Sequence, residues 1–576
     1  MERVVAGALH APGAHATGSP DDSDSRTTIG LRHATPLAIA TDWRAAATLT
    51  GITDEAALAG LCAALLPSAT VVSARERALL AAISLQPVAT TAIDRTISAI
   101  QQGTDPLGEC LLALRPAAQR RADGAVYTPA TILAPMIAWL RTQGKPVRVV
   151  DPGAGSGRFI LAAGAAFDNA QLIAVETDPL AALVLRTNLH LRGMTTRSQV
   201  LVDDYRRIKL PKIAGMTAFV GNPPYVRHHH IGARWKRWYT RNFKTLGIHA
   251  SAMAGLHLHF FLKTALLASA NDVGTFVTSA EWLDVNYGAA LRKLLTQHLG
   301  VVGLHVLAPA VEGFSGTATT TAITCFRGAA PQTSVRVRPV NSLTELAALD
   351  SGADVLPAQL DAATRWSSVI YPVQARDSDT VPLGELFRVL RGQVTGANRV
   401  WVFGDDRPSL PDSVLIPTIT RAQDLIRVAD RLESTASLRR VVDLAPDLDC
   451  YVGEEREQID AYLTWARRHR ADQGYIARHR RAWWSVGLRE PAPILCTYMA
   501  RRAPQFTLNV GEARHINVAH GLYPRQPMSE RQLAAIVEWL NRNVEVGSGR
   551  TYAWGLIKFE PKEVQQLRIP AHLASG

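Results

Sequence analysis

The tetrapeptide Asn222-Pro223-Pro224-Tyr225 combines residue types that could hold and activate an amino group. Two consecutive prolines fix the backbone and remove two amide donors, so the loop is rigid and its carbonyl groups are free to accept hydrogen bonds. Asn222 adds a side-chain carbonyl oxygen, and Tyr225 offers a flat face for stacking. Two acceptors in fixed geometry suit an exocyclic amino group on a planar ring, because they draw the nitrogen lone pair out of conjugation. Such a nitrogen can attack a methyl sulfonium directly. The alternative is a surface turn, in which Asn-Pro is common.

A glycine-rich segment, Asp151 to Gly157, follows the predicted strand that ends at Val150. Its glycines let the backbone turn sharply and approach a ligand, and Glu176 at the end of the next strand could accept both ribose hydroxyls of a nucleoside. The ligand could be a dinucleotide or S-adenosylmethionine. The dinucleotide fingerprint is not matched, because the third glycine falls one place early. Asp151 would repel a pyrophosphate but attract a sulfonium, which favours S-adenosylmethionine. A purely structural turn is the remaining interpretation.

Two stretches of the chain combine basic and aromatic residues, as sites for DNA phosphates and unpaired bases do. Residues 226–249 contain no acidic residue, and their predicted DNA contacts are Arg227, Arg234, Lys236 and Arg237. Trp235, Trp238, Tyr239 and Phe243 are interleaved with these cations, as partners for bases. Residues 462–489 supply the second set, namely Arg467, Arg468, Arg478, Arg480 and Arg481. Arginines here would read guanine edges; the alternative is a solvated helix face. The three histidines at 228–230 are not expected to bind metal, since the reaction needs none.

The order of these motifs resembles the gamma class of DNA adenine-N6 methyltransferases of restriction-modification systems. In that class a first motif, a glycine-rich motif and the Asn-Pro-Pro-Tyr loop precede a C-terminal target recognition domain. By this resemblance Asn222, Pro223 and Tyr225 are catalytic. The cofactor would contact Tyr127, Thr128, Asp151, Gly153, Gly155, Glu176, Asp204 and Tyr205. Because Asp203 precedes Asp204, the Asp of the family's Asp-aromatic pair could be either of the two. Tyr225 and a second aromatic, Tyr287 or else Trp282, would stack on the target base.

The resemblance implies transfer of a methyl group from S-adenosyl-L-methionine to the N6 amino group of adenine in duplex DNA, after the base is flipped out of the helix. A separately encoded restriction endonuclease would be a partner, since no Glu-x-Lys nuclease element precedes Lys145, the first lysine. One chain that holds both catalysis and recognition is compatible with a monomer. The alternatives are a cytosine-N4, RNA-base or protein-glutamine methyltransferase, and, from another class, a non-catalytic DNA-binding specificity module.

The elements that would position these residues fall into four parts. Residues 1–35 are small and polar and predict a disordered tail, and residues 36–115 have helical spacing and predict a helical N-terminal domain. In residues 116–330 Val/Ile strands alternate with helices. This pattern predicts an α/β, doubly wound, Rossmann-like domain with ligands at the carboxyl ends of the strands, and the resemblance implies that it is the methyltransferase domain. The resemblance likewise implies that residues 331–576, which have short strands and a few helices, form a mixed α+β DNA target recognition domain.

Composition is consistent with this assignment. The 576 residues include 62 Lys+Arg against 50 Asp+Glu, and the formal net charge of +12 favours a polyanionic partner. A GC-rich genome could also enrich arginine, but it would not explain where the arginines cluster. The 5 cysteines form no CxxC pair, which argues against a zinc ribbon or disulfide framework and predicts a reducing cytoplasm. The resemblance to methyltransferases of restriction-modification systems implies that this cytoplasm is bacterial or archaeal and that the protein lies close to the nucleoid. No apolar run is long enough to predict a membrane span.

Overall fold

We describe a computed structural model of the chain. The described part of the structure comprises residues 50–83, 88–115, 127–308, 311, 314, 320–328, 332–371, 379–404, 407–500, 502–545, 548–552 and 556–574. The predicted tail at 1–35 lies outside these residues. No helix among them is long and apolar enough to cross a membrane.

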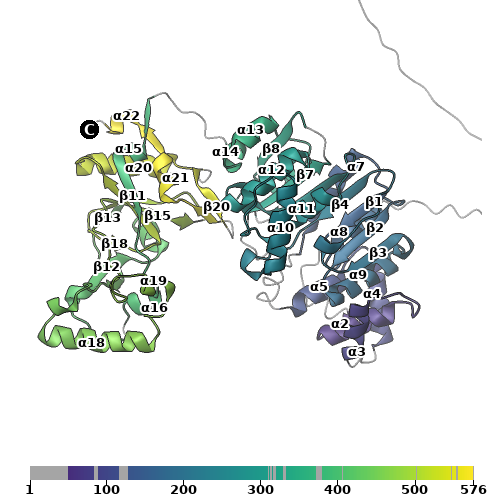
Figure 1. Cartoon of the computed structure of the whole chain (residues 1–576), viewed down its shortest axis with the longest axis horizontal. Coiled ribbons are helices and arrows are strands. Elements are labelled where there is room, and N and C mark those ends of the chain that lie inside the picture. The colour runs from purple at the N-terminus through teal and green to yellow at the C-terminus, as the bar shows by residue number, and fades with distance from the viewer. Residues whose placement is uncertain are drawn as a thin grey trace, which may run out of the picture. The chain divides into compact units, whose positions relative to one another are not determined.

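A nine-stranded sheet organises the central part of the chain (Figure 1), with strand order β3-β2-β1-β4-β5-β7-β6-β8-β9. Its strands are β1 (Arg148–Asp151), β2 (Gln171–Glu176), β3 (Ser198–Val202), β4 (Thr217–Gly221), β5 (Val273–Ser279), β6 (Val301–Leu307), β7 (Thr321–Arg327), β8 (Val335–Val340) and β9 (Ala353–Val355). Strands β1 to β5 are parallel, and β7 runs antiparallel between β5 and β6. The prediction of an α/β doubly wound fold is confirmed. Strands β8 and β9 lie beyond the predicted boundary at residue 330, so this sheet continues to Val355.

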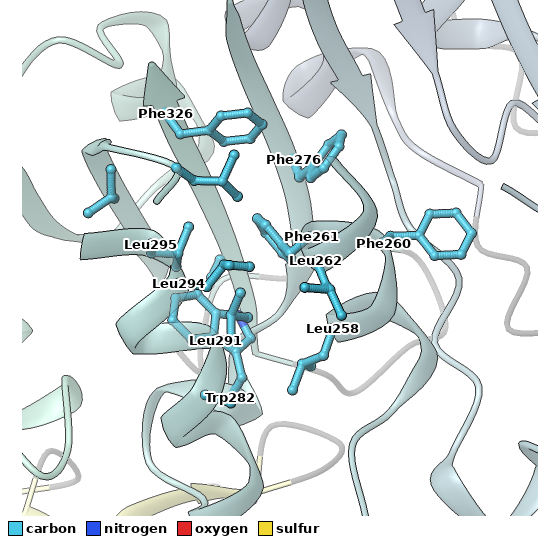
Figure 2. Close-up of a cluster of buried hydrophobic side chains, with 14 of the residues drawn as sticks. Leu258, Phe260, Phe261, Leu262, Phe276, Trp282, Leu291, Leu294, Leu295 and Phe326 are labelled. Atoms are coloured by element: carbon cyan, nitrogen blue, oxygen red, sulfur yellow. The ribbon is translucent and has the colours of Figure 1, made fainter. Parts of the chain in front are cut away.

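Helices cover both faces of the sheet, because neighbouring strand residues point to opposite sides. Val149 packs with α7 (Ala130–Gln143) and α8 (Arg158–Ala166), whereas the next residue, Val150, packs with the second set of helices. That set comprises α10 (Ala233–Thr245), α11 (Leu256–Leu267) and α12 (Ala289–Gln297). Figure 2 shows its core, where leucines of α11 and α12 surround Phe261, Phe276, Trp282 and Phe326.

The N-terminal helices share a hydrophobic core with helix α9 (Pro179–Leu191), which follows β2 of the nine-stranded sheet. They are α2 (Glu55–Leu65), α3 (Ala74–Ala82), α4 (Thr90–Gln101) and α5 (Pro106–Leu114). Leu58, Leu61 and Leu107 pack with Leu180 and Leu183 of α9 in one buried cluster. A capping box of Ser73 and Glu76 begins α3. These helices are therefore joined to the catalytic part through α9.

The C-terminal part contains several small sheets and a few longer helices. The largest sheet has the order β11-β19-β15-β17-β13, built from β11 (Phe387–Arg391), β19 (Ala519–Pro524), β15 (Ile494–Thr497), β17 (Phe506–Asn509) and β13 (Arg431–Leu432). A second sheet pairs β12 (Leu415–Ile419) with β14 (Arg440–Val442) and β18 (Arg514–His515). The longest helices are α18 (Gly453–Arg468) and α20 (Glu530–Asn543), and Ser529 caps the latter. The division into four domains stays a prediction.

All five cysteines lie within the described residues and are free thiols. Cys62, Cys110, Cys325 and Cys496 are buried, and burial raises the pKa of each thiol, to about 12 for Cys62 and Cys325. Cys450 is exposed.

Candidate functional site

The glycine-rich turn and the Asn-Pro-Pro-Tyr loop lie side by side at the carboxyl ends of β1 and β4. These strands are parallel neighbours, so their ends meet at the same edge of the sheet. A Cβ added to Gly153 would lie 3.5 Å from Pro224 Cδ, and one added to Gly221 would lie 2.9 Å from Asp151 Oδ1. The two motifs, about seventy residues apart in the sequence, therefore form one site.

The turn itself requires glycine at two positions. Gly155 has φ 54° and Gly157 has φ 101°, which are left-handed conformations that favour glycine. Gly157 then begins helix α8. The backbone amide of Gly155 donates to Glu176 Oε2 at 2.8 Å, which joins the turn to the acid at the end of β2.

Glu176 and Asp151 differ in their hydrogen bonds. Glu176 also accepts from the amides of Thr177 at 2.7 Å and Asp178 at 3.0 Å, and these amides oppose the increase in its pKa that burial causes. Asp151 is fully buried, and the backbone amides of Gly153 and Ile160 lower the pKa of its carboxyl group only in part. Burial raises the pKa of Asp151 to about 8. A buried carboxyl group beside the glycine-rich turn fits a cationic ligand group, so these residues are compatible with S-adenosyl-L-methionine.

A hydrogen bond joins the predicted first motif to the catalytic loop. Asn222 Nδ2 donates to Thr128 Oγ1 at 3.0 Å, which fixes the orientation of the side-chain amide. The carbonyl oxygen of Thr128 in turn accepts from Arg158 Nη1 at 2.6 Å, and the Arg158 guanidinium carbon lies 3.8 Å from the centre of the Tyr127 ring. Residues Tyr127, Thr128 and Asn222 are therefore brought together as the sequence predicts.

Two rings beside this site have different surroundings. The Tyr225 ring is half-buried, its hydroxyl lies 3.5 Å from the carbonyl oxygen of Val277, and His257 meets it edge-on with ring centroids 6.0 Å apart. His257 is buried, neither ring nitrogen has a hydrogen bond to another described residue, and burial lowers its pKa to about 4. His257 is therefore a neutral part of the wall around Tyr225.

The two candidates for the second aromatic residue that stacks on the target base, Trp282 and Tyr287, differ in burial. Trp282 is fully buried and donates to Thr278 Oγ1 at 3.2 Å, so it has no face for a base. Tyr287 is half-buried and donates to Glu281 Oε2 at 3.1 Å. Burial raises the pKa of Glu281. Of the two alternatives, only Tyr287 keeps part of its ring accessible.

The Asp-aromatic step lies just after β3. Tyr205 is fully buried and its hydroxyl shares a hydrogen bond of 3.0 Å with Thr264 Oγ1. Asp204 forms an ion pair of 2.6 Å with Arg206, whereas Asp203 is more exposed. Phe260 was not foreseen from the sequence, because it stands within an apolar run. Its ring lies 5.2 Å from that of Tyr205 and 3.5 Å from the Cβ position of Gly153, and in Figure 2 it points away from Phe261 and Trp282.

Helix α10 separates the first basic stretch into two faces. Arg234, Arg237, Arg241 and Lys244 are exposed and follow the spacing of one helix face. They line a groove of about 1010 Å³. Lys236 does not line this groove, and Arg227 is exposed before the helix.

The aromatic residues of this stretch are mostly unavailable to bases, which corrects the prediction. Tyr239 and Phe243 are fully buried core residues. The Arg206 guanidinium covers the Trp235 ring at 3.9 Å. Trp238 alone lines the groove, and it also stacks on His259 with centroids 6.1 Å apart.

The second basic stretch includes the end of α18 and the short helix α19 (Tyr475–Arg478). Arg467, Arg468, Arg478 and Arg481 are exposed. Arg480 differs, because its guanidinium is half-buried and donates to the carbonyl oxygen of Val394. Arg480 therefore supports the local fold rather than presenting a free cation. Within the described ranges no group of His, Cys, Asp or Glu side chains could hold a metal ion, His228–His230 included.

Comparison with known proteins gives relatives for nearly the whole chain. The family model of the Eco57I restriction-modification methylase matches residues 171–305, and that of the C-terminal domain of type II methyltransferase M.Eco57I matches residues 368–576. Type II methyltransferase M.XamI of Xanthomonas campestris pv. amaranthicola is 56% identical over 525 residues, covering 90% of this chain and 98% of that protein. Type II methyltransferase M.AccI of Acinetobacter calcoaceticus is 20% identical over 469 residues, covering 78% and 85%.

Among solved structures, the type IIL restriction-modification enzyme MmeI in complex with DNA has a similar fold. It matches with a TM-score of 0.55 at 14% identity, over 88% of this chain and 79% of that chain.

Proposed function

Since the chain belongs to the type II DNA methyltransferases of restriction-modification systems, whose cofactor is S-adenosyl-L-methionine, we propose that it methylates the N6 amino group of adenine at a specific site in duplex DNA. The observation that carries the proposal is the hydrogen bond from Asn222 Nδ2 to Thr128 Oγ1. Because the amide nitrogen donates to Thr128, we assign the carbonyl oxygen of the same amide as the acceptor for the substrate amino group. When bound, S-adenosyl-L-methionine would supply an electrophilic methyl group.

The residues of this chain then have defined roles. Asn222 Oδ1 and the carbonyl oxygen of Pro223 accept the two amino protons and so raise the nucleophilicity of the nitrogen. Tyr225 and Tyr287 hold the flipped base by stacking, which offsets part of the few kcal/mol that flipping costs. Tyr127, Thr128, Asp151, Glu176 and the glycine-rich turn would hold the cofactor, and Asp204 and Phe260 would contact its adenine. Tyr205, which is fully buried, supports the Phe260 ring, with ring centroids 5.2 Å apart.

The DNA backbone is proposed to follow the groove along α10. Four cations from Arg234 to Lys244 extend over about 15 Å of helix, at the helical rise of 1.5 Å per residue. No ion pair within the described part of the chain neutralises them. Exposed cations in a row favour phosphates whatever the sequence. Base reading is assigned to exposed arginines of the C-terminal part, Arg467, Arg468, Arg478 and Arg481.

The experiment is transfer of labelled methyl groups to DNA by the Asn222→Ala variant. Transfer should be abolished while binding of DNA and of S-adenosyl-L-methionine persists, because the substitution removes the proposed acceptor of the amino protons and one hydrogen bond to Thr128, and leaves the proposed cofactor and DNA contacts in place. Hydrolysis of the methylated DNA and mass spectrometry of its nucleosides then identifies the base. N6-methyladenine supports the proposal. N4-methylcytosine would refute the adenine assignment, and full transfer by Asn222→Ala would refute the mechanism.

The groove is tested by the salt dependence of DNA binding. Each phosphate contact contributes about 0.9 to the slope of log affinity against log salt. The double variant Arg241→Gln/Lys244→Gln should therefore reduce that slope by about 2, equally for all DNA sequences. Arg95→Gln/Arg141→Gln removes the same charge from exposed positions on α4 and α7 and should leave the slope unchanged. Equal slopes for both double variants would exclude the groove as a backbone site.

A further inference from the structure

Asp105 links the N-terminal helices to the glycine-rich turn. It caps α5, where its Oδ1 accepts from the amide of Gly108 at 3.0 Å. The same oxygen accepts from Asn188 Nδ2 of α9 at 2.8 Å, and Oδ2 accepts from Ser156 Oγ at 2.7 Å. Asn188 Nδ2 also donates to the carbonyl oxygen of Ser156 at 3.0 Å. Ser156 lies between the two left-handed glycines of the turn, so both its side chain and its backbone are held from outside the motif.

The contact between α5 and the turn is close and buried. Asp105 is 3% exposed and Asn188 is fully buried. A Cβ added to Gly108 would lie 2.2 Å from Asp105 Oδ2 and 2.5 Å from Ser156 Oγ. There is room at position 108 only for glycine, because the helix backbone itself approaches the serine. The hydrogen bond between Ser156 and Asp105 is therefore shielded from water, and this shielding strengthens it.

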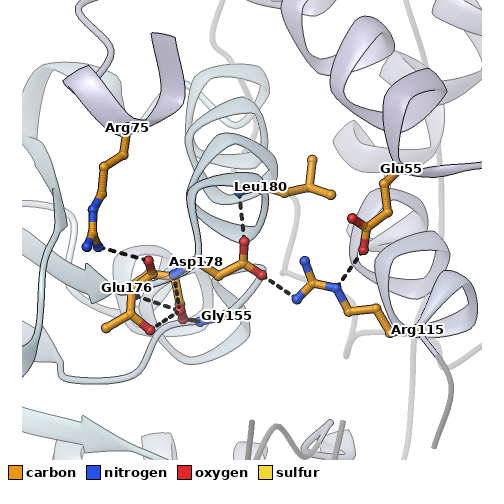
Figure 3. A network of polar contacts seen from close by, with 8 residues as sticks. Glu55, Arg75, Arg115, Gly155, Glu176, Asp178 and Leu180 are labelled. Atoms are coloured by element: carbon orange, nitrogen blue, oxygen red, sulfur yellow. Dashed lines mark hydrogen bonds and ion pairs between the residues drawn. The ribbon is translucent and has the colours of Figure 1, made fainter. Parts of the chain in front are cut away.

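A second set of contacts joins the same helices to the segment after Glu176 (Figure 3). Arg115 forms ion pairs with Asp178 and, at 2.8 Å, with Glu55 of α2. Arg75 of α3 donates to the carbonyl oxygen of Thr177 at 3.3 Å. The amides of Thr177 and Asp178 are the donors that hold the Glu176 carboxylate. Helices α2 to α5 thus contact the residues next to both cofactor motifs.

We propose that helices α2 to α5 belong to the cofactor-binding apparatus, and that Asp105 is a positioning residue that holds the glycine-rich turn in its binding conformation. Glycine residues lose more conformational freedom on ordering than any other residue, so a turn built on them is mobile unless it is tied down. Asp105 orders the turn before the ligand arrives, which lowers the cost of binding. The proposal rests on the proposed function only for the identity of the cofactor.

The test is calorimetric titration of the full-length protein with S-adenosyl-L-methionine. Asp105→Ala should raise the Kd at least tenfold, and steady-state assays should show the KM for the cofactor rising more than kcat falls. Asp54→Ala is the matched control, since Asp54 also caps a helix of this segment, accepting from the amide of Ala57 at 2.8 Å, but does not contact the turn. It should lower the melting temperature and leave the Kd within twofold of the wild-type value.

Two further variants separate positioning from general destabilisation. Asp105→Asn keeps an acceptor for Gly108 and Asn188 and can donate to Ser156, so it should restore most of the affinity. Ser156→Ala leaves the cap of α5 in place and should weaken binding of S-adenosyl-L-methionine as much as Asp105→Ala does. This variant tests the proposal even if Asp105→Ala does not fold. Wild-type affinity in Asp105→Ala or in Ser156→Ala would overturn the proposal. Equal losses of affinity in Asp54→Ala and Asp105→Ala would also overturn it. Absence of binding by the wild-type protein would instead refute the proposed function.

Discussion

Thr128→Val removes one hydroxyl group and leaves the shape of the side chain nearly unchanged. The hydroxyl accepts the 3.0 Å hydrogen bond from Asn222 Nδ2, and Thr128 itself is 4% exposed, so water cannot easily replace it. Removing the partner of a half-buried amide costs about 1 to 2 kcal/mol, which corresponds to about a 5- to 30-fold change in an equilibrium or rate. We expect kcat to fall by this factor, because the Asn222 amide is then free to rotate away from the amino group.

The assay is a single-turnover measurement of labelled methyl transfer with saturating DNA and cofactor. Thr128→Ser restores the hydroxyl and should recover most of the rate. The backbone carbonyl of Thr128 still accepts from Arg158 in both variants, so the affinity for S-adenosyl-L-methionine should change by less than threefold. A Thr128→Val enzyme with the wild-type rate would refute the idea that Thr128 orients Asn222. A loss confined to cofactor affinity would place Thr128 in cofactor binding alone.

Three other substitutions have clear expected outcomes. Gly157→Ala should lower the melting temperature in thermal denaturation, since φ is 101° and the new Cβ would lie 2.4 Å from Leu185 Cδ1; an unchanged melting temperature would contradict this strain. Glu76→Ala should destabilise the protein to chemical denaturation by about 3 kcal/mol, because Glu76 is fully buried and pairs with Arg186 at 3.0 Å; a loss below about 1 kcal/mol would show that the pair contributes little. Asp151 has a folded pKa of about 8, above its unfolded value of about 3.9, so the folded state binds the extra proton and stability falls as pH rises from about 4 to 8. Asp151→Asn should remove this part of the pH dependence in melting curves recorded from pH 5 to 9, and parallel curves for both proteins would contradict it.

The fold of the catalytic part could be predicted because its signals are local. Strands such as Gln171–Glu176 are short runs of apolar residues, and each is followed by a turn and an amphipathic helix. The alternation fixes a parallel sheet, and parallel strands place Asp151, Glu176 and Asn222 at one edge. The extension of the sheet by β8 and β9 had no such signal, because the sequence there lacks the repeat of strand, turn and amphipathic helix.

The contacts that complete the site are not local, which is why the sequence did not indicate them. Asp105 meets Ser156 across 51 positions and Asn188 across 83. Single Asp, Ser and Asn residues at such separations have no pattern to distinguish them. Phe260 was missed for a related reason, since one phenylalanine among apolar neighbours looks like any core residue.

One missed assignment could have been found in the sequence. In α10 the cations stand at 234, 237, 241 and 244, while Tyr239 and Phe243 are four residues apart on the other face. Helical periodicity alone therefore indicates that these two rings are core residues. The position of Trp235 beneath Arg206 is different, because Arg206 comes from a separate element, the short 3-10 helix Tyr205–Arg207 after β3.

The burial of four of the five thiols makes Cys450 a selective attachment point. Thiol reagents attack the thiolate, and burial both blocks access to Cys62, Cys110, Cys325 and Cys496 and disfavours their ionised form. Cys450 stands just before α18, the helix that ends in Arg467 and Arg468. A maleimide fluorophore should therefore label the native protein once, without any cysteine replacement. Its emission would report directly on DNA approaching the C-terminal part, independently of methyl transfer.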